Sequence, residues 1–148
     1  MTEVEFFPAL ADDLDALVAI RIAAMRESLE RIGRFDPARA RERFAKSFVP
    51  AFCRKIVHQG QIIGFFALAI NEKALVLEHL YILPASQSQG IGAHVLSIVF
   101  NEARVLGLLV RVGALRGSRS NTFYVRNGFC LVEQTEFDNY YSRSQGST

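Results

Sequence analysis

Residues 74–107 read ALVLEHLYILPASQSQGIGAHVLSIVFNEARVLG, and this stretch decides the fold. Residues 74–83 are nearly all apolar, which is typical of a buried strand, and the proline that follows ends the run. Residues 90–106 carry apolar side chains around most of a helix, which predicts a buried helix capped by Gly107. Residues 108–115 form another apolar strand. The order strand, helix, strand predicts a crossover between two parallel strands.

An antiparallel meander is predicted ahead of this crossover. Residues 52–57 and 62–70 have the composition of strands, and residues 74–83 form the third strand of the set. The connections at Gln59-Gly60 and at residues 71–73 are short, and short connections join antiparallel neighbours.

A short strand and two helices come first in the chain. Residues 4–7 read as the strand, Asp12 or Asp13 can cap the first helix, and Asp36-Pro37 can open the second. The apolar residues of the first helix share one face at helical spacing. They are Leu14, Leu17, Val18, Ile22, Met25 and Leu29.

The C-terminal part is predicted as a helix over residues 118–126 and strands over residues 129–133 and 137–142. The predicted fold class is therefore mixed α/β, of the α+β kind. An antiparallel meander leads into one βαβ crossover, with helices on both faces of the sheet. A chain of 148 residues has the usual size of one domain, so we expect residues 1–148 to form a single domain.

The composition excludes several classes of protein. The formal charge is only +2, and no basic cluster indicates a nucleic-acid partner. No apolar run reaches the roughly 20 residues of a membrane span, and the acidic start is unlike a signal peptide. Cys53 and Cys130 form no CxxC motif and lie in apolar runs, which favours buried thiols in a reducing compartment. We therefore expect a cytoplasmic protein with no membrane or nucleic-acid partner.

A phosphate-binding loop is predicted where the strand of residues 74–83 leads into the next helix. Glycines let the backbone approach a ligand, and the free amides and dipole of a helix start favour an anion. The amides that can cradle a pyrophosphate belong to Ser88, Gln89, Gly90, Ile91, Gly92 and Ala93. A Walker loop is excluded, because Ala93 and His94 stand where Lys and Ser or Thr are needed. A Rossmann loop is excluded, because Val95 replaces its third glycine or alanine.

At this point the sequence resembles the GNAT superfamily of N-acetyltransferases, the GCN5-related acetyltransferases. The strand end Leu80-Tyr81-Ile82-Leu83-Pro84, followed by Gln87-Ser88-Gln89-Gly90-Ile91-Gly92, is similar to the family's cofactor motif. The segment Phe123-Tyr124-Val125-Arg126-Asn127-Gly128-Phe129 is similar to its later Phe-Tyr-x-x-x-Gly-Phe motif. The two motifs and the element order cover nearly the whole chain.

The resemblance implies an acyltransferase with acetyl-CoA, or another acyl-CoA, as donor. In the family, the strands matching residues 74–83 and 108–115 splay apart and pantetheine lies in the gap, paired with main chain near Leu80, Tyr81 and Ile82. Gln87 opens the family's Gln-x-x-Gly-x-Gly loop and so joins the cofactor-binding residues. Many members carry an Asn shortly before the Tyr of the second motif. Here Ser118 holds that place and Asn121 follows, so either can contact the pantetheine.

Two side chains are candidates for the chemistry. Tyr124 matches the general acid of many family members and suits protonation of a leaving thiolate, although it can instead only pack against the sulfur. Glu78 interrupts an apolar strand, where a carboxylate is costly unless it is paired or faces a cleft. It is expected either to accept the amine's proton through water, as acidic residues on this strand often do in the family, or to serve as a structural carboxylate. His79, on the opposite face, is expected to be a satisfied core or surface histidine, and the role of base is the alternative. Main-chain N–H groups near residues 80–82 are expected to stabilise the oxyanion.

The expected function is transfer of an acetyl group to a primary amine of an unidentified acceptor by direct attack on the thioester. The alternative is a catalytically silent module that holds acyl-CoA as a sensor or scaffold. Residues 25–48 are expected to recognise the acceptor, but their mixed charges select no class of amine. No metal is expected, because the histidines have no ligand spacing. Dimers are common in the family, so a homodimer is a further expectation.

Overall fold

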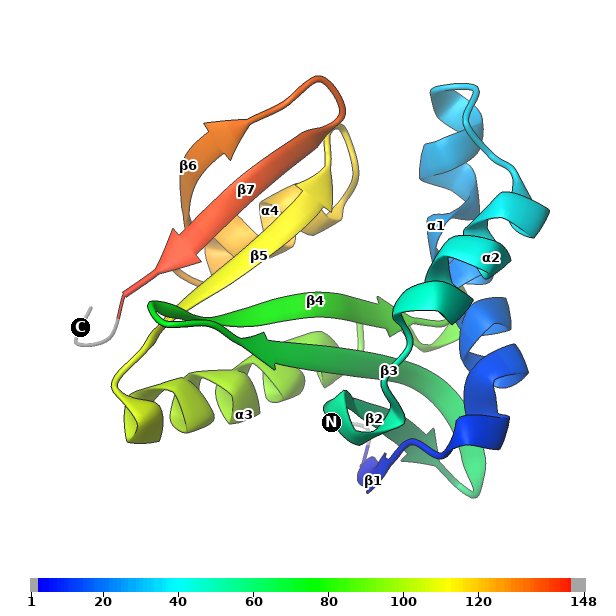
Figure 1. The fold of residues 1–148 in the computed structure, drawn as a ribbon, viewed down its shortest axis with the longest axis horizontal. Coiled ribbons are helices and arrows are strands. Elements are labelled where there is room, and N and C mark those ends of the chain that lie inside the picture. The colour runs from blue at the N-terminus through cyan, green and yellow to red at the C-terminus, as the bar shows by residue number, and fades with distance from the viewer. Residues whose placement is uncertain (1–2, 145–148) are drawn as a thin grey trace. The chain divides into compact units, whose positions relative to one another are not determined.

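The computed structural model describes residues 3–144 (Figure 1). In these residues the strands form one seven-stranded sheet in the order β1-β2-β3-β4-β5-β7-β6. The strands are β1 (Glu5–Pro8), β2 (Cys53–His58), β3 (Gln61–Ile70), β4 (Ala74–Ile82), β5 (Leu109–Leu115), β6 (Cys130–Gln134) and β7 (Asp138–Arg143). The α-helices are α1 (Leu14–Arg31), α2 (Pro37–Ser47), α3 (Ile91–Leu106) and α4 (Ser120–Arg126).

The chain divides into two compact units. The first consists of Met1–Ala67 with His79–Gly92, and the second of Leu68–Glu78 with Ala93–Thr148. The first unit therefore contains α1, α2 and the end of β4, and the second contains the start of β4, most of α3 and the strands that follow.

The strands β1, β2 and β3 of the first unit are antiparallel. β1 pairs with β2 through Phe6 opposite Ile56, and β2 pairs with β3 through Lys55 opposite Phe65. Gln59 and Gly60, both with positive φ, make the tight turn between β2 and β3. The predicted antiparallel direction is confirmed for these strands.

An aspartate precedes each of the helices α1 and α2 of the first unit, but only the predicted cap of α2 is confirmed, because the Asp13 side chain makes no capping bond to α1. Asp13 Oδ2 accepts a hydrogen bond from the Leu10 N–H at 2.8 Å and pairs with Lys55 Nζ at 2.9 Å. Burial raises the pKa of the Asp13 carboxyl, but the bonds from Leu10 and Lys55 outweigh burial and leave that pKa below its ordinary value. Asp36 caps α2 by accepting a hydrogen bond from the Arg39 N–H at 3.1 Å. Asp13 thus ties the start of α1 to β2.

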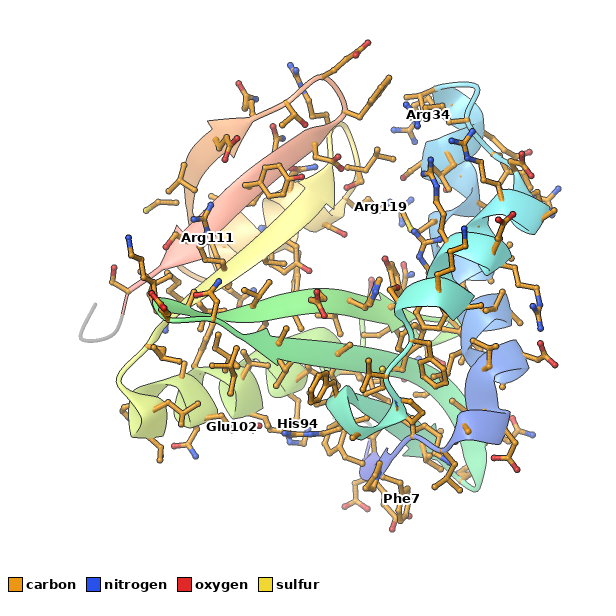
Figure 2. The ribbon with its side chains drawn as sticks, in the orientation of Figure 1. Phe7, Arg34, His94, Glu102, Arg111 and Arg119 are labelled. Atoms are coloured by element: carbon orange, nitrogen blue, oxygen red, sulfur yellow. The ribbon has the colours of Figure 1, made fainter. Side chains whose placement is uncertain are left out.

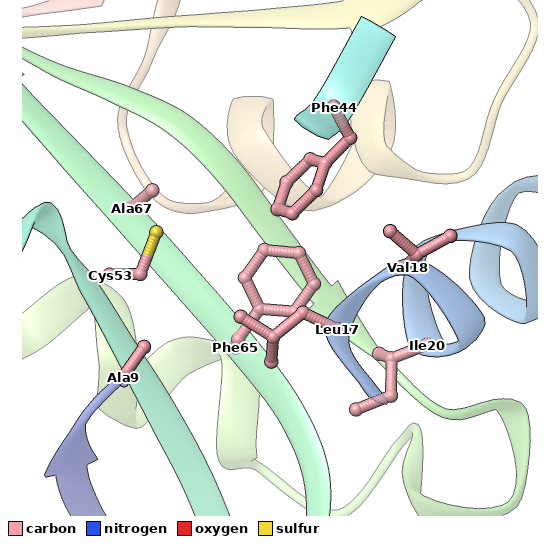
Figure 3. Close-up of a cluster of buried hydrophobic side chains, with 8 residues drawn as sticks. All are labelled: Ala9, Leu17, Val18, Ile20, Phe44, Cys53, Phe65 and Ala67. Atoms are coloured by element: carbon pink, nitrogen blue, oxygen red, sulfur yellow. The ribbon is translucent and has the colours of Figure 1, made fainter. Parts of the chain in front are cut away.

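A cluster of buried side chains forms the core of the first unit (Figure 3). Its members are Ala9, Leu17, Val18, Ile20, Phe44, Cys53, Phe65 and Ala67. Phe44 of α2 meets Phe65 of β3 edge to face, with ring centroids 5.5 Å apart. Tyr81 and Leu83, at the end of β4, pack against the cluster. Burial of a large apolar side chain stabilises a fold by roughly 1.5–3 kcal/mol. The core therefore holds the end of β4 in place.

A parallel pair of strands organises the second unit. Ala74–Leu77 of β4 runs parallel to Leu109–Val112 of β5, and α3 connects the two strands. β5 pairs antiparallel with β7, which pairs antiparallel with β6. Asn71 shapes the turn into β4, because its side-chain oxygen accepts a hydrogen bond from the Ala74 N–H at 2.8 Å. The predicted βαβ crossover is confirmed.

Aromatic side chains pack against one another in the second unit. Phe100 of α3 lies 5.7 Å from Phe129, measured between ring centroids, and the Arg143 guanidinium lies 3.8 Å above the Phe100 ring. One face of α3 is buried, through Val95, Leu96, Val99 and Ala103. In the described residues, no helix combines the length and apolar character that crossing a membrane requires.

Two burial predictions were wrong. The helix α3 is not buried around most of its surface, since Val105 and Leu106 at its end are 78% and 51% exposed. Cys130 is exposed, whereas Cys53 is buried as predicted. The reason for Cys130 is its place on β6, the last strand of the sheet, where every residue is exposed.

Candidate active site

The predicted phosphate loop joins the end of β4 to the start of α3. A short 3₁₀ helix (Pro84–Ser86) follows β4, and α3 begins at Ile91. Ser88 has a φ of 63° and Gly90 a φ of 81°, so both are in the left-handed region. Glycine enters that region without strain, whereas a serine there is uncommon. Left-handed residues within such a loop turn successive N–H groups toward one side, which makes an anion-binding concavity.

The start of α3 adds further donors to this loop. The first N–H groups of an α-helix have no acceptor within the helix, and the dipole of a helix as long as α3, 16 residues, favours an anion there. Ser88, Gln89 and Gly90 are exposed. The loop can therefore present main-chain donors to a phosphate group from solvent.

The two glutamines of the loop bond to its own backbone. Gln87 Nε2 donates to the carbonyl oxygen of Ile82 at 2.9 Å, and Gln89 Nε2 donates to the carbonyl oxygen of Ala85 at 3.4 Å. These side chains brace the loop, so its donors toward a pyrophosphate are main-chain amides. Gln87 thus helps to fix the shape of the loop.

The end of β4 is held closely against β3. Leu80, Tyr81 and Ile82 are all partly buried. The Leu83 N–H donates to the carbonyl oxygen of Ile63 at 2.8 Å. A Cβ added to Gly64 would lie 2.5 Å from the carbonyl oxygen of Tyr81. Only glycine permits this approach of the two backbones.

Glu78 and His79 are neighbours on β4 with different environments. Glu78 is exposed, and its side chain has no hydrogen bond or ion pair with the residues that the structure describes. His79 packs against the rings of Phe44 and Tyr81, at centroid distances of 5.3 and 5.6 Å. Its Nδ1 lies 3.3 Å from the Tyr81 hydroxyl. The Glu78 carboxylate is thus open to water, whereas one nitrogen of His79 is occupied by Tyr81.

The charge state of His79 follows from its surroundings. Burial first, and the positive charge of Arg21 second, lower the pKa of His79 to about 4. Near neutral pH the imidazole is therefore uncharged.

Tyr124 lies on α4 in an aromatic cluster of the second unit. Its side chain is 4% exposed, and its ring contacts Phe129 and Tyr141 at centroid distances of 5.4 and 6.2 Å. Gly128, with a φ of 90°, turns the chain back after α4, and the Phe129 N–H donates to the carbonyl oxygen of Tyr124 at 3.1 Å. The Phe-Tyr-x-x-x-Gly-Phe motif therefore fixes the orientation of its own tyrosine.

The Asn121 side chain is fully engaged inside the second unit. Its Nδ2 donates to the carbonyl oxygens of Leu115 and Ser118, both at 2.9 Å. Its Oδ1 accepts from Asn139 Nδ2 at 2.8 Å and from the Tyr141 hydroxyl at 2.7 Å. An amide has two N–H donors and two oxygen lone pairs, so Asn121 has none left for a ligand. Ser118, whose hydroxyl hydrogen has no assigned acceptor among the described residues, is the better candidate for a pantetheine contact.

The charges of residues 25–48 mostly pair along the two helices. The pairs Arg26–Glu30, Arg31–Glu27 and Lys46–Glu42 span 3.2, 3.3 and 3.4 Å. All of these side chains are exposed, and such pairs contribute little to stability. Arg34 lies in the loop between α1 and α2 (Figure 2). The basic run on α2, Arg39, Arg41, Arg43 and Lys46, is exposed, as expected of a solvated helix face.

Sequence reasoning missed Arg21. Its guanidinium carbon lies 5.7 Å from the centre of the Tyr81 ring, and its Nε is buried without a hydrogen-bond partner in the described residues. The available signal was its position, one helical turn after Leu17 and Val18 on the apolar face of α1. Among residues 3–144, no cluster of His, Cys, Asp or Glu side chains could hold a metal ion.

Comparisons with solved structures show where this fold occurs. The PaiA N-acetyltransferase of Thermoplasma acidophilum, solved with coenzyme A, has a TM-score of 0.84 at 18% identity and covers 97% of this chain and 99% of its own. A GCN5-related N-acetyltransferase from Rhodopseudomonas palustris has a TM-score of 0.74 at 16% identity and covers 97% of both chains. At such identities the likeness shows the fold, and it confirms the predicted mixed α/β GNAT fold.

Sequence comparison identifies the family directly. Comparison with curated proteins gave no significant match. The family profile described as Acetyltransferase (GNAT) domain matches residues 52–130, which is more than half of the chain. The match includes the loop of residues 87–92 and all of the Phe-Tyr-x-x-x-Gly-Phe motif. The chain therefore belongs to the GNAT family of acetyl-CoA-dependent N-acetyltransferases.

Proposed function

We propose that the protein transfers the acetyl group of acetyl-CoA to a primary amine, which attacks the thioester carbonyl directly. The observation that carries this proposal is the left-handed backbone of Ser88 and Gly90 immediately before α3. That backbone and the free N–H groups of the helix start suit the pyrophosphate of CoA. The coenzyme A complex of the Thermoplasma protein, which has the same fold, supports this donor.

The thioester arm of the donor would pair with the end of β4. Leu80, Tyr81 and Ile82 offer main-chain groups there, and the packing of Tyr81 on the core of the first unit supports a fixed strand end. In the second unit, Ser118 is the side chain proposed to contact the pantetheine.

The proposed reaction forms one bond and breaks another. The amine nitrogen bonds to the carbonyl carbon, and the carbon–sulfur bond then breaks. Main-chain N–H groups of residues 80–82 stabilise the oxyanion of the tetrahedral intermediate. Glu78, exposed and unpaired within the described residues, accepts the amine's proton through water. Tyr124 donates its hydroxyl proton to the departing thiolate and recovers a proton from solvent.

Two measurements test this function. The first is thermal unfolding with and without millimolar CoA. CoA at 100 times its dissociation constant should stabilise the fold by about 2.7 kcal/mol. The second is release of free thiol from acetyl-CoA in the presence of a broad panel of primary amines. Binding with amine-dependent thiol release supports the proposal. Binding without release for any amine would favour the silent CoA-binding module, and absence of binding would contradict the donor site.

A further inference from the structure

Arg21 occupies a position of α1 that faces the core of the first unit. Residues one turn apart share a face of a helix, and Arg21 follows Leu17 and Val18, which are 0% and 6% exposed. Both belong to the buried cluster against which Tyr81 packs. The Arg21 guanidinium accordingly reaches the Tyr81 ring, at 5.7 Å from its centre.

No anion neutralises this guanidinium within the described part of the chain. Arg21 makes no ion pair with an Asp or Glu among residues 3–144, and its buried Nε has no hydrogen-bond partner there. Arg21 as a whole is partly buried, and removing part of a charged group from water without a partner has a cost that a cation–π contact offsets only in part. The Arg21 guanidinium is therefore a candidate to pair with an anion of a ligand.

Arg143 gives a useful contrast. Its Nε is also buried without a hydrogen-bond partner in the described residues. However, its guanidinium lies 3.8 Å above the Phe100 ring, and its Nε is 3.1 Å from the position of a Cβ on Gly128. The Arg143 guanidinium is therefore in close contact with an aromatic ring, whereas the Arg21 guanidinium lies 5.7 Å from the centre of the Tyr81 ring.

The groups beside Arg21 suit an anion. The Tyr81 hydroxyl and the His79 imidazole lie 3.3 Å apart, and both can take part in hydrogen bonds. The low pKa of His79, about 4, leaves Arg21 as the positive charge of this group near neutral pH. Phe44 and Phe65 form an apolar wall next to His79, at ring distances of 5.3 and 6.2 Å. Hydrogen bonds in an apolar surrounding are stronger than in water.

We propose that Arg21, Tyr81 and His79 form a subsite for a carboxylate of the acceptor, so that the acceptor is an amino acid or another amine that carries a carboxylate. This inference rests on the proposed acetyl transfer. The guanidinium offers two parallel N–H groups along the edge that includes Nε, and this edge matches the two oxygens of a carboxylate. Tyr81 is also part of the strand end proposed to hold the thioester. A carboxylate bound there keeps the amine of the same molecule close to that strand end.

Binding of product analogues tests the subsite without requiring turnover. Pairs of N-acetyl α- and ω-amino acids and their amides are titrated calorimetrically into the protein saturated with CoA. The acid should bind about 10–100-fold more tightly than its amide, since a hydrogen-bonded charge contributes on that scale. Arg21→Gln should abolish the difference. Arg21→Lys, which keeps the charge and loses the paired donors, should reduce it.

The matched control is Arg104→Gln. Arg104 is an exposed arginine of α3 whose guanidinium donates to the Asn101 side chain, and its loss should leave the acid preference unchanged. For any amino acid that is acetylated, Arg21→Gln should raise the KM of the amino acid and leave the KM of acetyl-CoA unchanged.

Three results would overturn the inference. The first is a parent protein that does not distinguish any acid from its amide. The second is an acid preference that survives in Arg21→Gln. The third is a loss of CoA affinity in Arg21→Gln, which would assign the anion to a phosphate of CoA. Failure of the proposed function looks different, because the acid preference in binding would then persist while no amine releases thiol from acetyl-CoA.

Discussion

The carbonyl oxygen of Tyr81 on β4 lies 2.5 Å from the point that a Cβ on Gly64 of β3 would occupy. That distance is far shorter than any contact between a carbon and an oxygen atom that are not bonded. Tyr81 is also the residue around which the thioester-binding strand end and the carboxylate subsite are proposed. The absence of a side chain at Gly64 therefore permits the close approach of this part of β4 to β3.

Gly64→Ala should lower the free energy of unfolding by about 1–3 kcal/mol, because overpacking forces the backbone of β4 to move. It should also raise the KM of acetyl-CoA. Urea unfolding and steady-state kinetics measure the two effects. Gly113→Ala is the control, since a Cβ there would meet the Tyr140 ring at 3.0 Å, and a side chain can move more easily than a backbone. Equal losses of stability in the two variants would contradict this account.

Gly92→Val should weaken CoA binding at least tenfold, or by about 1.4 kcal/mol. The valine side chain would occupy space at the first turn of α3, where the pyrophosphate is proposed to bind. The free protein should still fold, since Gly92 is not among the residues with positive φ. Calorimetric titration with CoA measures the affinity. Ser97→Val, at an exposed position of the same helix, controls for the effect of valine on α3. Parent-like affinity in Gly92→Val would mean that the pyrophosphate binds elsewhere.

Tyr124→Phe should lower the turnover rate by roughly 10²–10⁴, the usual contribution of general acid catalysis, and leave CoA affinity nearly constant. The ring keeps its contacts with Phe129 and Tyr141, and only the hydroxyl is lost. Single-turnover kinetics with a confirmed acceptor measure the chemical step. Tyr140→Phe removes a hydroxyl from the neighbouring strand β7 and should have little effect. An unchanged rate in Tyr124→Phe would leave the tyrosine as a packing residue.

Ser118→Ala should mainly change the KM of acetyl-CoA, whereas Asn121→Ala should mainly change the stability of the protein. Ser118→Ala should raise the KM of acetyl-CoA by about 3–10-fold, the value of one hydrogen bond, with little change in stability. Asn121→Ala should lower the free energy of unfolding by about 1–3 kcal/mol, because Asn139 and the Tyr141 hydroxyl lose their acceptor. Chemical unfolding and kinetics on both variants decide the assignment. A rise in the KM of acetyl-CoA that is confined to Asn121→Ala would assign the pantetheine contact to Asn121 and not to Ser118.

His79 should make the protein less stable as the pH falls from about 6.5 to about 4. Burial, with Arg21 as the second cause, lowers the pKa of His79 to about 4, so the unfolded chain takes up a proton at a higher pH than the native protein. The contribution of His79 to the free energy of unfolding is therefore fully present above the pKa of this histidine in the unfolded chain. It is lost as the pH falls below that value, by at most about 3 kcal/mol. Urea unfolding of the parent and of His79→Phe across this range isolates the effect. Identical pH dependence in the two proteins would contradict it.

The strands and helices follow from local signals in the sequence. Asp36 and Pro37 specify the start of α2 because a cap and a fixed φ act within one turn. The crossover was predictable because residues 74–115 switch from strand to helix period and back. The exposed end of α3 was not predictable, since an apolar residue such as Val105 can point to solvent when the buried face is already filled.

The parts of the site that depend on distant residues could not be assigned from the sequence. The sequence made Asn121 a candidate for a pantetheine contact. Its hydrogen-bond partners Asn139 and Tyr141 come from β7, 18 and 20 residues later. Arg21 on α1 and its partner Tyr81 on β4 lie far apart in the sequence, so no local pattern connects them. The glycines and Tyr124, which the motifs carry in order, were predictable, and their roles in catalysis and binding stay predictions.

The bond from the Gln87 side chain to the carbonyl oxygen of Ile82 would make the proposed phosphate loop a preorganised receptor. The conformational entropy of Ser88 and its neighbours is lost when the chain folds, and it need not be lost again when a ligand arrives. Replacing Gln87 with a residue that cannot form this bond would loosen the loop without removing any main-chain donor. CoA would then bind more weakly, with a larger entropic penalty, although every atom in contact with it stayed the same.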